Sequence, residues 1–74
     1  MGGTEERIGI YSATECVQKC QEKQAENPNY NGVTHNPKEN ICWCEIGMTG
    51  AEESPKWNTC FLPGKGVKGC PSLF

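Results

Sequence analysis

The chain of 74 residues contains no aspartate, and all nine of its acidic residues are glutamates. Calcium-binding loops take many of their oxygen ligands from aspartate, so this absence argues against such a site. No apolar run approaches the roughly 20 residues of a membrane-spanning helix, and we expect no membrane insertion. Seven lysines and arginines leave a net charge of −2. The chain therefore lacks the basic excess that attracts nucleic acid or an anionic membrane, and we expect no nucleic-acid partner.

The start of the chain also lacks the apolar segment of a signal peptide, since residues 1–6 are polar and acidic. If the chain comes from a secreted protein, it is therefore a mature or excised segment. We expect residues 1–6 to be disordered. Histidine occurs once, at His35, and no nucleophile is paired with a base as hydrolysis would need. The sequence predicts neither an enzyme nor a bound cofactor.

Six cysteines in so short a chain indicate a disulfide scaffold from an oxidising compartment. A domain of this size buries little apolar surface and normally needs such cross-links. A zinc site is disfavoured, because zinc knuckles use Cys-x-x-Cys pairs and the cysteines here have other spacings. We therefore expect disulfides and no metal.

Two cysteine doublets have spacings that match each other. Cys16 and Cys20 stand four apart in a stretch with helical character, and Cys42 and Cys44 stand two apart in a stretch typical of a strand. Each pair lies on one face of its element, and both spacings come to about 6 Å. Two disulfides can therefore fasten the helix to the strand. The order is either nested, 16–44 with 20–42, or crossed, 16–42 with 20–44, and we favour the nested order.

A capping box formed by Ser12 and Glu15 predicts a helix over residues 13–26, which ends before Pro28. Alternating or β-branched residues predict four strands, over residues 7–11, 30–35, 41–46 and 57–62. The second and third of these form a hairpin with a five-residue loop, 36–40. In the first strand, alternation places Ile8 and Ile10 on one face.

These elements predict a small, disulfide-rich α+β domain. One helix is clamped by disulfides onto a three- to four-stranded antiparallel sheet, within residues 7–62. Residues 63–74 form a loop and tail rich in glycine and proline. The third expected disulfide joins Cys60 and Cys70.

The candidate binding residues are aromatic. If Cys42 and Cys44 face the helix, alternation turns Trp43 to the opposite face of the sheet. Tyr30 or His35, across the hairpin, would complete an aromatic patch there, and Trp57 is a further candidate. Tryptophan and tyrosine are enriched where proteins stack on sugars or anchor protein partners. We therefore expect a non-catalytic extracellular module, and for its partner we favour a carbohydrate or glycoprotein over an extracellular protein without sugar.

Four motifs follow one another along the chain: Ser12-x-x-Glu15-Cys16-x-x-x-Cys20, residues 30–36, Cys42-x-Cys44, and residues 57–62. Together they resemble the PAN/apple superfamily, and the two cysteine doublets among them are also similar to the related WSC modules. The resemblance covers about residues 7–62. It implies a helix held on a small antiparallel sheet and an extracellular adhesion or recognition role, with no shared catalytic residues.

A second resemblance concerns the two doublets alone. A helical Cys-x-x-x-Cys bridged to a strand Cys-x-Cys is similar to the cysteine-stabilised αβ motif of defensins and scorpion toxins. That resemblance implies the bridges Cys16–Cys42 and Cys20–Cys44. It gives the alternative function, a secreted effector peptide that acts as a channel blocker, a protease inhibitor or a signalling factor.

Overall fold

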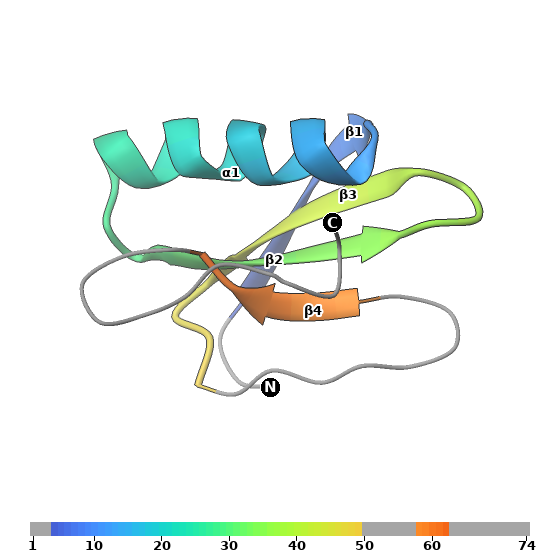
Figure 1. Ribbon diagram of the computed structural model, residues 1–74. Coiled ribbons are helices and arrows are strands. Elements are labelled where there is room, and N and C mark those ends of the chain that lie inside the picture. The colour runs from blue at the N-terminus through green and yellow to red at the C-terminus, as the bar shows by residue number, and fades with distance from the viewer. Residues whose placement is uncertain (1–3, 50–57, 63–74) are drawn as a thin grey trace.

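The computed structural model describes residues 4–49 and 58–62 of the chain (Figure 1). These residues form one helix and four strands. In chain order the elements are β1 (Thr4–Ile10), α1 (Ala13–Glu26), β2 (Tyr30–Asn36), β3 (Ile41–Ile46) and β4 (Asn58–Phe61).

The four strands form one sheet in the order β1-β3-β2-β4, and every neighbouring pair is antiparallel. Helix α1 lies across one face of this sheet (Figure 1). The predicted fold class, a small α+β domain with a helix linked by disulfides to an antiparallel sheet, is confirmed.

Helix α1 has the predicted bounds because both of its ends are set locally. The Ser12 hydroxyl accepts a hydrogen bond from the backbone N–H of Glu15 at 3.3 Å, and the Glu15 carboxylate accepts one from the backbone N–H of Ser12 at 3.5 Å. At the other end, the N–H of Asn27 bonds to the carbonyl of Lys23, and Pro28 follows. The capping box satisfies donors that would otherwise be unpaired at the first turn.

Strand β1 begins at Thr4, three residues before the predicted start at Arg7. Residues 4–6, which we expected to be disordered, pair with residues 44–46 of β3. A bulge lies between Arg7 and Gly9, where φ of Gly9 is +134°. The bulge also overturns the expected alternation. Ile8 packs against the core on the helix side, whereas Ile10 lies opposite Ile41 on the other face.

The disulfides between helix and sheet are Cys16–Cys42 and Cys20–Cys44. The nested order that we favoured is wrong. Because α1 and β2 are joined by a short connection, they run in opposite directions, and β3 runs antiparallel to β2 (Figure 1). Helix α1 and β3 therefore run in the same direction, which brings the first cysteine of one doublet to the first of the other. This crossed order is the one implied by the resemblance to the cysteine-stabilised αβ motif.

The core lies between α1 and the sheet. The four bridged cysteines are fully buried, and the other buried apolar residues of this cluster are Val17, Val33 and Leu62. Cys60 packs beside it and is itself disulfide-bonded. Its expected partner, Cys70, lies outside the described residues, as do the tail 63–74 and Trp57.

We call the two bridges Cys16–Cys42 and Cys20–Cys44 the clamp. Removing one of them tests how much it contributes to the stability of the fold. Replacing Cys20 and Cys44 together by serine opens a link between residues 24 apart in sequence. The loop-entropy relation gives a loss of about 3 to 4 kcal/mol in the free energy of unfolding. Urea unfolding followed by circular dichroism measures the loss. Gln18→Ser, on an exposed position of the same helix, should cost well under 1 kcal/mol. A double cysteine variant as stable as this control would contradict the central role of the clamp.

Candidate functional site

The face of the sheet opposite α1 carries an exposed apolar group. Because Cys42 and Cys44 bond to the helix, alternation turns Trp43 to the outer face, as the sequence predicted. Ile41 shares this face, and Ile10 of β1 lies directly across from it. Ile10 is 61% exposed, and the other two side chains are half-buried. We call Ile10, Ile41 and Trp43 the outer patch.

Tyr30 and His35 do not join Trp43, and the predicted grouping of the three is wrong. His35 lies opposite Cys42, on the helix side, and is only 2% exposed. Tyr30 also lies on the helix side, where its hydroxyl donates to a Glu6 carboxylate oxygen at 3.3 Å. The Lys23 amine stands 5.6 Å from the centre of the Tyr30 ring.

The register of the hairpin explains the position of His35. We expected a five-residue loop, 36–40, but Asn36 pairs with Ile41, so the loop is one residue shorter. The Asn36 side chain stabilises it by accepting from the backbone N–H groups of Lys38 and Glu39, at 2.9 and 3.2 Å. A shift of one residue exchanges the faces of a strand, so His35 turns inward.

The position of Tyr30 has a different cause. The register of β2 against β3 shifts between Tyr30 and Gly32, and the shift brings Tyr30 opposite Ile46. Without it, regular alternation would place Asn31 there and Tyr30 on the outer face. The faces on which Tyr30 and His35 lie therefore depend on the register of β2 against β3, which the alternation of residues within a strand does not specify.

His35 is held in one tautomer by its surroundings. Its Nε2 lies 2.9 Å from the carbonyl oxygen of Tyr11, which can only accept, so Nε2 carries the hydrogen. The other ring nitrogen, Nδ1, is buried and has no hydrogen-bond partner among the described residues. Because the ring is enclosed, His35 serves packing between the hairpin and the start of α1 and presents no surface to a ligand.

Next to the outer patch, the same face holds a buried polar cluster. The Thr34 hydroxyl donates to the Glu45 carboxylate at 2.9 Å and lies 2.9 Å from the Thr59 hydroxyl. All three residues are at most 5% exposed. Thr34 has one hydrogen to donate, so Thr59 must donate to Thr34 while Glu45 is ionised. The cluster joins β3, β2 and β4, and the sequence analysis did not find it.

Glu45 is the residue of this cluster that titrates. Burial raises the pKa of its carboxyl above 4.5 because the charged form loses hydration, and the negative charge of Glu5, directly across in β1, adds to this rise. The hydrogen bond from Thr34 acts in the opposite direction. Sequence analysis could have found this raised pKa only by noting that Glu5 faces Glu45. That step requires the register of β1 against β3, which the sequence does not specify.

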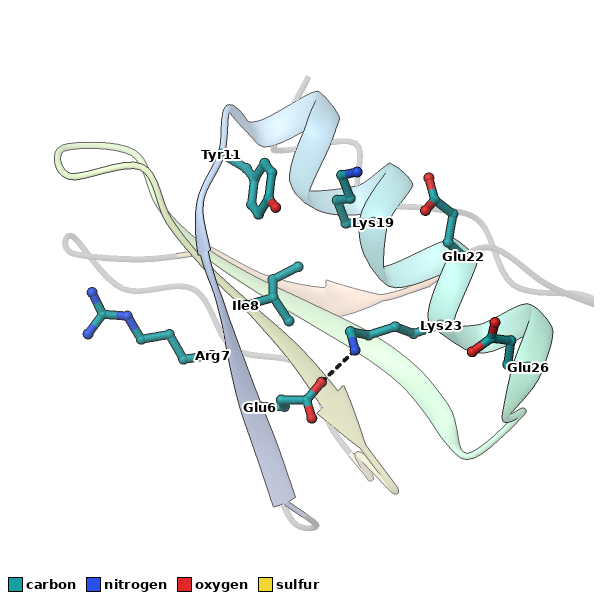
Figure 2. Close-up of a pocket in the computed structure, with 8 residues that line it drawn as sticks. All are labelled: Glu6, Arg7, Ile8, Tyr11, Lys19, Glu22, Lys23 and Glu26. Carbon is teal, nitrogen blue, oxygen red and sulfur yellow. Dashed lines mark ion pairs between the residues drawn. The ribbon is translucent and has the colours of Figure 1, made fainter.

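On the helix side, a groove of about 510 Å³ runs between β1 and α1 (Figure 2). Its lining consists of Glu6, Arg7, Ile8, Tyr11, Lys19, Glu22, Lys23 and Glu26. An ion pair between Lys23 and Glu6, at 2.9 Å, crosses it. The hydrogen bond in this pair lowers the pKa of Glu6 and raises that of Lys23. Acidic and basic side chains both line the groove, so it does not select ligands strongly by the sign of their charge.

The cysteine cluster does not offer metal ligands in this state. The sulfurs of Cys16, Cys20 and Cys42 lie within 4.8 Å of one another, close enough for three thiolates to share an ion. All three are oxidised in disulfides, and the thiolate is the form that binds zinc.

Comparisons with known proteins place no constraint on the function. No family model, no curated protein and no solved structure matches the chain. In the part of the chain that the structure describes, no helix has the length and apolar character needed to cross a membrane.

The buried Glu45 predicts how stability varies with pH. Because the folded-state pKa lies above the ordinary value of 4.5, the stabilisation linked to the protonated carboxyl is fully present below that value. It is lost as pH rises through the folded-state pKa. Glu45→Gln removes the titrating group, so its free energy of unfolding relative to the wild type should rise between acid and neutral pH.

Unfolding curves in urea, recorded from acid to neutral pH, measure the effect. Glu39→Gln, which changes an exposed glutamate in the hairpin loop, is the matched control and should follow the wild type. A wild-type chain that gains stability relative to Glu45→Gln as pH rises would show that the direction is wrong.

Proposed function

We propose that this domain is a non-catalytic extracellular recognition module that binds a protein or glycoprotein through the outer patch. The observation that carries the proposal is the exposed apolar surface of Ile10 beside Trp43, on the face of the sheet that α1 does not cover. Oxidised cysteines are consistent with an extracellular location.

The chemistry of the patch favours a protein surface over a bare sugar. Tyr30 and His35 face the helix, so the nearest neighbours of Trp43 on the outer face include aliphatic Ile41 and the side chain of Arg7, directly across in β1. Tryptophan and arginine with surrounding apolar contacts are the usual composition of protein hot spots.

Thr34 lies directly across from Trp43 in β2. Its hydroxyl is buried and bonded to Glu45 and Thr59. It is therefore not available to the hydroxyl groups of a sugar, which a sugar site would need to bind.

The clamp supports this role through rigidity. Trp43 lies between two cysteines that are both bonded to α1, so the backbone on either side of it is fixed. A side chain that is already ordered loses less conformational entropy when a partner binds. The outer patch is therefore small, but the backbone that carries Trp43 is preorganised for binding.

Trp43→Ala tests the proposal. The labelled domain is applied to an array of extracellular protein domains and to a glycan array, and hits are titrated with the variants. The proposal predicts binding on the protein array, and Trp43→Ala should weaken it at least about tenfold. Lys19→Ala, in the groove on the helix side, should leave it unchanged. Binding that survives the loss of Trp43 but not of Lys19 would move the site to the groove.

The order of the disulfides favours a second candidate, a secreted effector peptide on a cysteine-stabilised αβ scaffold. The bridges Cys16–Cys42 and Cys20–Cys44 are the ones that this resemblance implies. The net charge of −2 opposes action on anionic membranes. Block of an ion-channel current or inhibition of a protease by the purified domain would support the effector, whereas we expect neither.

A further inference from the structure

Strand β1 is an edge of the sheet with nothing beside it in the described part of the chain. It occupies the end of the order β1-β3-β2-β4 and pairs only with β3 among the described strands. An edge strand presents backbone N–H and C=O groups that can accept a further strand. The charges of β1 indicate which strand would fit.

Glu5 and Arg7 alternate on the outer face of β1, and both side chains are exposed. Arg7 points away from α1 (Figure 2) and has no ion pair with the described residues. Glu5 has Glu45, a like charge, directly across from it. Among the described residues, neither has an opposite charge directly across the ladder in β3. In an antiparallel pairing of two copies, each can supply that opposite charge to the other.

We propose that two copies of this domain associate through β1, antiparallel and centred on Glu6. This register places Glu5 of each copy opposite Arg7 of the other. Facing pairs of opposite charge stabilise a sheet, and facing like charges destabilise it. The surface pairs with itself around a twofold axis, which gives a closed dimer.

The neighbouring registers are less favourable. A ladder centred on Glu5 would place the Glu5 side chains of the two copies opposite each other, and a ladder centred on Arg7 would do the same with Arg7. Neither like-charge pair has an opposite charge to balance it among the described residues. A ladder centred between Glu6 and Arg7 would pair these two, but Glu6 already binds Lys23 at 2.9 Å. In the proposed register the two Glu6 carboxylates face each other, and each has its own Lys23 to balance the charge.

The bulge limits the length of the ladder. It begins after Arg7 and includes Gly9, so the regular part of the new pairing runs from Thr4 to Ile8. This length is symmetric about Glu6, since Thr4 then faces Ile8. Such a short contact predicts a weak dimer, with an interface below about 1,200 Å².

The dimer would have a consequence for binding. Residues that face each other across an antiparallel ladder lie on the same face, so both helices would cover one face of the joined sheet. The two outer patches would lie together on the other face. A partner with two matching surfaces would then bind with increased avidity.

Charge exchange at β1 tests the proposal on the whole chain. Sedimentation equilibrium over a concentration series that extends into the millimolar range should show a dimer of twice 8.1 kDa. Glu5→Arg and Arg7→Glu each create two facing like-charge pairs and should weaken dimerisation by roughly tenfold or more. The double variant Glu5→Arg/Arg7→Glu should restore it. An equimolar mixture of the two single variants should form a mixed dimer.

Circular dichroism and urea unfolding confirm that each variant is folded before it is compared. Lys38→Glu serves as the matched control, because it reverses one charge at an exposed position of the hairpin loop and leaves β1 unchanged. A chain that stays monomeric throughout the series overturns the proposal. So does a dimer that Lys38→Glu abolishes, or one that the single charge variants of β1 leave intact.

Discussion

The two disulfides between α1 and β3 are the constraint on which the other features depend. Only Cys16, Val17 and Cys20 are buried on the helix, and so thin a stripe does not hold a helix on a sheet by apolar burial alone. The bridges supply what burial lacks. They also fix which face of β3 points inward. A slip of one residue would turn both cysteines away from the helix, so the clamp sets the outward direction of Trp43.

Elements with local signals were predictable from sequence. The capping box and Pro28 bound α1 correctly at both ends, and the alternation of residues 41–46 gave β3 its full length. The disulfide order was also within reach, because a short connection after α1 and a hairpin after β2 make α1 run parallel to β3. The start of β1 was not, because residues 4–6 have no strand pattern and are ordered by pairing with β3.

In the candidate site, too, one feature was predictable from local sequence and the others were not. The outward direction of Trp43 follows from its two neighbours, and sequence reasoning found it. The companions of Trp43 depend on register, and register depends on single residues in turns and bulges. One residue fewer in the hairpin loop turns His35 inward, and one bulge at Gly9 separates Ile10 from Ile8. The outer patch therefore contains isoleucines where aromatic residues were expected.

The outer face has two halves with different physical roles. On the β4 side, Thr34, Glu45 and Thr59 are buried and hydrogen-bonded, and an unpaired buried polar group is costly, so this half fixes how β4 pairs with β2. On the β1 side, the exposed Ile10 adjoins the two half-buried side chains of the outer patch, and the charged side chains of β1 share this face. Strand β1 is also an edge of the sheet and has only β3 beside it among the described strands. The surface proposed for a partner and the edge proposed for a second copy therefore adjoin each other. Recognition and self-association would therefore both depend on β1, the strand whose pairing was hardest to predict from sequence.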